Sequence, residues 1–167
     1  MATPAFADKV KINVTDSGFD RSRLLIQQGD TVKWNFSPDN QTDHEVRGPF
    51  FDSGPIGPGG SFSFQFTGAG KYAVEDVLNP SATMLIKIPV LAEPPMGPID
   101  TIFLISMGNG PPDSYYWSVQ YKYPGAPGWV LLFRQVGGSF RFKADHGPGT
   151  YEFRGKTHEF AKPDHTD

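Results

Sequence analysis

The chain of 167 residues carries a formal net charge of −3 and contains 19 Gly and 16 Pro, so about a fifth of its residues disfavour helix interiors. Its 14 Phe, 6 Tyr and 3 Trp supply enough bulky side chains for packed cores, which excludes a disordered chain. Cysteine is absent, which excludes a disulfide scaffold, a Cys-ligated metal site and a thiol nucleophile. We therefore expect an all-β protein with short strands joined by turns.

Charge and hydropathy exclude further classes. The chain has 8 basic and 10 acidic residues up to Ala92, and 7 and 8 after it. This even spread predicts no basic stripe for a phosphate backbone, so nucleic acid is not expected as a partner. No segment approaches the roughly 18 apolar residues of a membrane span, so no membrane is expected either. Residues 1–8 have no basic region followed by an apolar run, so export by a signal peptide is not expected.

In the first half of the chain, apolar and polar residues alternate in three segments, 10–14, 31–36 and 61–66, which predicts half-buried strands. Segment 84–90 is typical of a closing strand. A Pro-rich stretch, 93–98, follows and predicts a stiff connector. We therefore predict a first domain over residues 1–92 and a linker over 93–98.

The second half repeats this pattern. Strand-like segments at 101–105, 116–123, 129–133, 139–143 and 151–154 are separated by turns rich in Gly and Pro. Short strands at roughly ten-residue spacing are typical of a β-sandwich. Residues 99–167 are therefore predicted to form a second small sandwich.

Residues 9–90 resemble a cupredoxin, the Greek-key sandwich of plastocyanin-like blue-copper proteins. The resemblance rests on Gly29-Asp30-Thr31-Val32-Lys33-Trp34, on Asp43-His44-Glu45-Val46 and on Ala69-Gly70-Lys71-Tyr72. It implies the fold over nearly the whole first domain.

The copper ligands are only partly kept. The resemblance matches His44 to the first His ligand, Asp76 to the Cys, Asn79 to the second His and Met84 to the Met. Blue copper needs a thiolate and two imidazoles with a weak axial thioether. Because two of the four ligands are replaced, we expect neither copper nor another cofactor. Two interpretations stay open: a remodelled site for a harder ion such as zinc or manganese, or turn-capping, hydrogen-bonding and core residues.

Residues 95–165 resemble a fibronectin type III or related immunoglobulin-like module. The resemblance rests on Trp117-Ser118-Val119-Gln120-Tyr121-Lys122, on Trp129 and on Gly149-Thr150-Tyr151-Glu152-Phe153-Arg154. It implies that Tyr151 ties its hydroxyl to the backbone. Tyr116, Tyr123 and Trp129 are the candidates for an exposed surface that contacts a protein or a sugar.

No catalytic constellation emerges. Asp145–His146 and Asp164–His165 are adjacent pairs in turn-like or terminal segments, so we expect no enzyme. We expect instead a structural or interaction protein, as a bacteriophage virion surface component that decorates the capsid or belongs to the tail. Its partners would then be other virion proteins in many copies, and a host-surface glycan, after assembly in the host cytoplasm. The alternative is a secreted, extracellular cupredoxin-like module that binds metal or carbohydrate.

Overall fold

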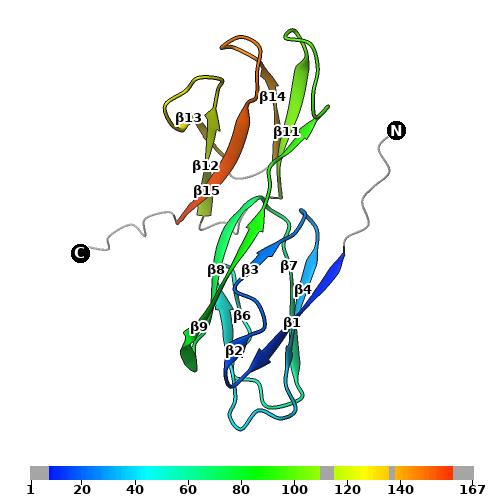
Figure 1. Ribbon diagram of the computed structural model, residues 1–167, viewed down its shortest axis with the longest axis vertical. Coiled ribbons are helices and arrows are strands. Elements are labelled where there is room, and N and C mark those ends of the chain that lie inside the picture. Colours follow the sequence, from blue (N-terminus) through cyan, green and yellow to red (C-terminus); the bar gives the residue numbers. More distant parts are fainter. Residues whose placement is uncertain (1–7, 110–114, 136–137, 160–167) are drawn as a thin grey trace, which may run out of the picture. The chain divides into compact units, whose positions relative to one another are not determined.

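The computed structural model describes residues 8–109, 115–135 and 138–159, and every regular element among them is a β-strand (Figure 1). The chain divides into two compact units. Unit 1 comprises Met1–Thr67 and Lys71–Pro89, and unit 2 comprises Gly68–Gly70 and Val90–Asp167. Each unit contains two sheets, so the predicted all-β class with two small sandwiches is confirmed.

The first sheet of unit 1 has the strand order β2-β1-β4-β7. Its strands are β1 (Lys9–Thr15), β2 (Gly18–Phe19), β4 (Thr31–Phe36) and β7 (Ser61–Gln65). Strands β1 and β4 are parallel, and Ile12 is the register partner of Trp34. Because side chains alternate along a strand, this register sends the apolar set of both strands to the same face.

The second sheet of unit 1 has the order β3-β9-β8-β5-β6. Its strands are β3 (Arg23–Leu25), β5 (Val46–Gly48), β6 (Phe51–Asp52), β8 (Gly70–Asp76) and β9 (Asn79–Ile88). The closing strand predicted at 84–90 thus begins earlier in the chain. Only Val77 and Leu78 separate β8 from β9, which makes the two strands a tight hairpin.

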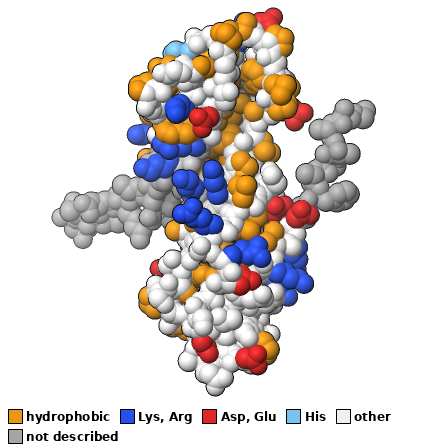
Figure 2. Space-filling view, in the orientation of Figure 1, with side chains coloured by type: hydrophobic (Ala, Val, Ile, Leu, Met, Phe, Trp, Pro, Cys, Tyr) orange, Lys and Arg blue, Asp and Glu red, His pale blue; other side chains and the backbone are white. Residues whose placement is uncertain are grey.

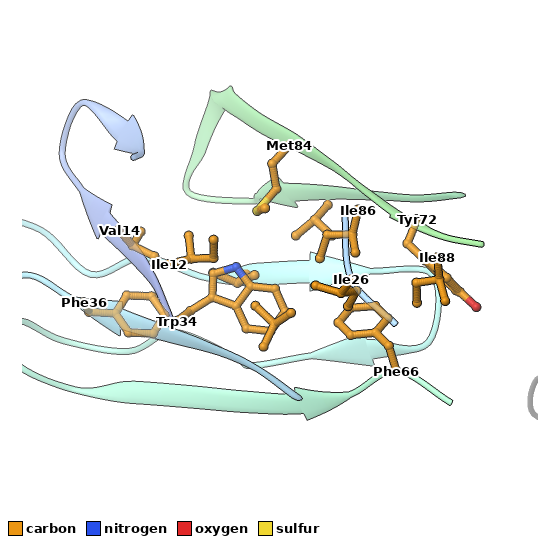
Figure 3. Packing of buried hydrophobic residues seen from close by; sticks show 13 residues of the cluster. Ile12, Val14, Ile26, Trp34, Phe36, Phe66, Tyr72, Met84, Ile86 and Ile88 are labelled. Carbon is orange, nitrogen blue, oxygen red and sulfur yellow. The ribbon is translucent and has the colours of Figure 1, made fainter. Parts of the chain in front are cut away.

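The core of unit 1 lies between its two sheets and is built around Trp34, whose side chain is fully buried. Figure 3 shows the side chains that meet there. The ring of Trp34 lies 5.2 Å from that of Phe51 and 5.9 Å from that of Phe62, measured between centroids. The remaining fully or almost fully buried members of this cluster are Ile12, Val14, Ile26, Val32, Phe36, Val46, Phe66, Tyr72, Val74, Met84, Ile86 and Ile88.

The two sheets of unit 2 have the orders β10-β11-β14 and β13-β12-β15. Their strands are β10 (Leu91–Glu93), β11 (Ile102–Gly108), β12 (Tyr115–Lys122), β13 (Val130–Gln135), β14 (Gly138–Lys143) and β15 (Glu152–Glu159). Strand β10 pairs with β11, so Leu91 and Ala92, which we had expected in the first domain, lie in a strand of unit 2. The sheet pairing therefore begins ahead of the Pro-rich stretch.

Unit 2 has a smaller core. Met107, Trp117 and Val119 are fully buried together with Ala69, whose N–H donates to the carbonyl of Met107 at 2.8 Å. A Cβ at Gly68 would lie 2.5 Å from the ring of Trp117, so the close approach of this segment requires glycine. The second cluster of this core contains Ile105, Tyr121 and Phe142.

The hydroxyl of Tyr151 accepts a hydrogen bond from the His146 N–H at 2.8 Å and donates one to the Gly147 carbonyl at 3.0 Å. The expected tie of this hydroxyl to the backbone is thus present.

We predict that Trp34→Ala lowers the free energy of unfolding of unit 1 by about 3–5 kcal/mol, because it removes a large, fully buried side chain and leaves a cavity. Urea unfolding followed by circular dichroism measures the change. Leu25→Ala is the control, since Leu25 is 67% exposed and its truncation should change stability by less than about 0.5 kcal/mol. Equal losses in the two variants would contradict the assignment of Trp34 to the centre of the core.

Candidate functional site

The position matched to a copper site holds a direct contact between His44 and Asp76. His44 Nδ1 lies 2.6 Å from Asp76 Oδ2, and the side chains are 1% and 0% exposed. His44 precedes β5 and is fixed on its backbone by two hydrogen bonds with Ile56. Asp76 is the last residue of β8. The imidazole and the carboxylate therefore meet in a buried, hydrogen-bonded pair.

The carboxylate of Asp76 has further partners. Its Oδ1 accepts hydrogen bonds from the backbone N–H groups of Glu45 at 3.1 Å and Leu78 at 3.2 Å. The second of these caps the β8–β9 turn. A buried carboxylate is costly unless its lone pairs are satisfied, and here both oxygens are used.

Asp16 completes the arrangement on the other side of the imidazole. Its Oδ1 lies 3.1 Å from His44 Nε2, and the Asp16 side chain is 41% exposed. The Gln41 N–H donates to Asp16 Oδ2 at 2.9 Å, which holds the pKa of Asp16 below its usual value, and the contact with His44 acts in the same direction. Both ring nitrogens of His44 thus face carboxylate oxygens. A ring nitrogen that carries a proton donates it to the carboxylate oxygen that it faces.

Asn79 and Met84 do not join this pair. Asn79 begins β9, and its Nδ2 donates to the Asp16 carbonyl at 3.2 Å. Met84 lies five residues further along β9, roughly 16 Å at the usual rise of a strand, with its side chain buried in the hydrophobic core. The structure therefore brings together His44 and Asp76, with Asn79 nearby, but not Met84.

Blue copper does not fit these residues. The thiolate that it needs is missing, because the chain has no Cys. Two ligand atoms bound to one zinc-like ion at about 2.0–2.2 Å would lie roughly 3.3 Å apart in a tetrahedral site. His44 Nδ1 and Asp76 Oδ2 are at hydrogen-bond distance instead, 2.6 Å. A harder ion would have to break this contact, so the pair fits the structural interpretation better than the metal one.

Within 8–109, 115–135 and 138–159, no group of three or more His, Cys, Asp or Glu side chains is arranged to hold a metal ion. The same residues include no helix that is long and apolar enough to cross a membrane.

The three aromatic candidates of unit 2 have different surroundings. The guanidinium carbon of Arg154 lies 4.2 Å from the centroid of the Trp129 ring, and that of Arg134 lies 5.6 Å from the Tyr116 ring. Tyr123 stacks instead on His146, at 3.7 Å between centroids and 11° between planes. All three side chains are half-buried, so Trp129 and Tyr116 form platforms for arginines rather than bare rings.

The adjacent pair Asp145–His146 is hydrogen-bonded, with 2.8 Å between Asp145 Oδ1 and His146 Nδ1. Asp145 Oδ2 accepts a hydrogen bond from the Tyr121 hydroxyl at 3.0 Å. These contacts, with the stacking on Tyr123, tie a turn to the sandwich. The other pair, Asp164–His165, lies outside the described residues.

Asp16 is the site residue that the sequence did not reveal. It lies in the turn between β1 and β2, and its type alone is what such a turn requires. Its role depends on contacts with Gln41 and His44, which are 25 and 28 residues away. A sequence pattern carries no signal for pairings at such separations.

No protein-family model and no curated protein matches the chain. Among solved structures, a purple cupredoxin from Nitrosopumilus maritimus is 20% identical with a TM-score of 0.43, over 47% of this chain and 98% of that chain. A mutant of amicyanin in the Cu(I) form is 18% identical with a TM-score of 0.44, over 48% and 81%. A second amicyanin mutant, reduced at pH 4, is 17% identical with a TM-score of 0.44, over 52% and 85%. These structural neighbours are cupredoxins over about half of the chain, at low identity.

We predict that Asp76→Ala and His44→Ala each lower the free energy of unfolding by about 3–5 kcal/mol, because each leaves a buried polar partner unpaired. The double variant should lose clearly less than the sum of the two, as measured by urea unfolding in a double-mutant cycle. Arg21→Ala is the control: Arg21 and Asp20 form an exposed pair at 3.7 Å, worth less than about 1 kcal/mol. Additive losses, within about 0.5 kcal/mol, would show that His44 and Asp76 are not coupled.

We also predict that Zn²⁺ or Cu²⁺ leaves the thermal unfolding midpoint unchanged, because a metal would have to displace the His44–Asp76 hydrogen bond. A site filled at about 100 times its Kd would instead add roughly 2.7 kcal/mol of stability. The measurement uses a His146→Gln background, which removes an exposed imidazole. A metal-dependent rise that vanishes with a further His44→Gln change would contradict the prediction.

Proposed function

We propose that this chain is a non-enzymatic structural or interaction protein whose sandwiches serve as scaffolds. The observation that carries the proposal is the contact between His44 and Asp76. A copper carrier keeps its imidazole available to the metal, whereas here Nδ1 of His44 is bound to a carboxylate at 2.6 Å. The first unit is therefore better suited to hold a shape than to exchange electrons.

A docking surface in unit 2 supports the interaction role. Leu91, Ile102 and Leu104 are 43%, 56% and 45% exposed. By strand alternation they lie on the outer face of the β10-β11-β14 sheet, opposite the buried Ile105 and Met107. Exposed apolar side chains that gather on one face are typical of protein interaction sites.

For the fold of unit 2 we keep the fibronectin type III or immunoglobulin-like assignment as part of this proposal. It is supported by the two antiparallel three-stranded sheets and by the hydrogen bonds of the Tyr151 hydroxyl to the backbone.

The assembly that we propose is a bacteriophage virion, in which the protein would decorate the capsid or belong to the tail. The apolar outer face of the β10-β11-β14 sheet would dock on other virion proteins in many symmetry-related copies. A fold alone does not imply a function. This step therefore rests on the general association of β-sandwich proteins with the surfaces of virus particles.

A carbohydrate-binding module, secreted to the cell exterior, is the second candidate. It is favoured by one observation: Arg134 and Arg154, which lie over the rings of Tyr116 and Trp129, place hydrogen-bond donors on one face of unit 2.

The virion proposal predicts that the protein is a stoichiometric component of particles purified from the organism that encodes it, detected by quantitative mass spectrometry. The exposed Leu104 offers a sharper test. Leu104→Asp should abolish incorporation because it replaces one of the three exposed apolar side chains of this face with a carboxylate, whereas Leu25→Asp, on unit 1, should not. Absence of the unmodified protein from purified particles would sink the proposal.

A further inference from the structure

One face of unit 2 gathers cations that the sequence spreads along the chain. Strand β12 lies between β13 and β15, and its residues Trp117, Val119 and Tyr121 are buried. The residues between them therefore point to the outer face of the sheet. Register then places four cations on this outer face, which we call the basic face: Lys122, Arg134, Arg154 and Lys156. Figure 2 shows Lys and Arg side chains gathered over these strands.

The cations of the basic face are accessible to solvent. Arg134, Arg154 and Lys156 are exposed, and Lys122 is half-buried. Among the residues that the structure describes, none of the four lies within 4.0 Å of a carboxylate. Glu152, the register partner of Lys122, is the one described acidic side chain on this face. The face therefore has a net positive charge that is available to a ligand.

Two of the four cations are held in place. Nε of Arg154 donates to Gln120 Oε1 at 2.8 Å, and its guanidinium lies over Trp129 at 4.2 Å. Arg134 lies over Tyr116 at 5.6 Å. Stacking on a ring and a hydrogen bond at Nε fix the plane of a guanidinium, and the Nη groups of Arg154 remain as donors. An arginine fixed in this way loses little entropy when it binds a planar anion.

From these observations we propose that the basic face binds an anionic polysaccharide through its carboxylate groups. The guanidinium fork matches a carboxylate in a bidentate geometry, and charge-assisted hydrogen bonds of this kind are strong. The neutral amide of Gln120 lies between the cations, where it suits the hydroxyl groups of a sugar.

The spacing of the cations favours a polymer with separated charges. Arg134 and Lys156 flank Ser118 on the two neighbouring strands, which puts their backbones roughly 10 Å apart, and the next row along the strands lies about 7 Å away. A single-stranded nucleic acid is bound by a continuous cationic groove and by free rings that stack the bases. Here both rings already carry arginines and Glu152 interrupts the charge, so nucleic acid is disfavoured.

A protein partner is better matched to the other sheet. Interfaces between proteins have an apolar core, and the outer face of β10-β11-β14 offers Leu91, Ile102 and Leu104. Among the described residues, the basic face has one exposed aliphatic side chain, Leu131, which the register places beside Gln120, and its rings of Trp129 and Tyr116 lie under arginines. The polysaccharide proposal stands apart from the virion proposal, because it concerns a ligand of one face and holds for a displayed or a secreted protein alike.

The test measures binding of the whole chain to polygalacturonate. The fully methyl-esterified polymer is the uncharged control ligand, and oligodeoxythymidylate tests whether a nucleic acid binds instead. Affinity electrophoresis and calorimetry at fixed ionic strength supply the affinities. We expect binding to polygalacturonate only. Arg154→Gln should weaken it about tenfold, since it removes one charged hydrogen-bonding group, and Arg134→Gln/Arg154→Gln should weaken it further.

Arg141→Gln is the matched control. It makes the same change of charge on the outer face of β14, opposite Leu104, and should change affinity by less than about twofold. Equal weakening by Arg141→Gln and Arg154→Gln would mean that only net charge matters and would overturn the proposal. Failure to bind polygalacturonate, equal binding of the esterified polymer, or tighter binding of oligodeoxythymidylate would each overturn it as well. Unchanged unfolding midpoints in these exposed variants ensure that a loss of binding reports on the face.

Discussion

The hydrogen bond between His44 and Asp76 is the contact on which one end of unit 1 depends. Through Nε2 the same imidazole reaches Asp16, so a carboxylate, an imidazole and a second carboxylate form one chain. Asp16 follows β1 of the first sheet and Asp76 ends β8 of the second. The three side chains therefore connect the turn that follows β1 of the first sheet to the end of β8 of the second sheet. Because His44 and Asp76 are buried and a buried polar group is costly when unpaired, neither of these two can be replaced alone without a loss of stability.

The same contact narrows what this fold can do in this chain. His44 Nδ1 is bound to a carboxylate here, and a metal could reach this nitrogen only by displacing Asp76. Asp76 Oδ2 lies 2.6 Å from His44 Nδ1, so this ring nitrogen is already engaged, and Met84 lies in the core. The interactions that we propose involve the surface instead, namely the two outer faces of unit 2.

Much of the fold could be predicted because it follows from local alternation. Ile12, Trp34 and Trp117 are buried as their alternating patterns required, and His44 could be singled out from its motif. Contacts between distant segments could not be predicted. The pairing of Asp16 with His44 depends on a loop closure that no pattern records. Nor does the pattern show that β10 pairs with β11, since Leu91–Glu93 is short and all three of its residues are exposed, without the alternation that marks a strand.

The charges of unit 2 illustrate the same limit and its consequence for function. Acidic and basic residues are evenly distributed along the chain, and this count does not show on which face of a sheet each charge lies. The strand register brings Arg134, Arg154 and Lys156 to one face. The exposed Leu91, Ile102 and Leu104 go to the outer face of the other sheet. Because the two sheets of a sandwich lie back to back about 10 Å apart, a partner docked on one outer face leaves the other open. In the proposed assembly many copies would then present their basic faces together, and even weak attraction for an anionic polymer would become firm attachment through multivalency.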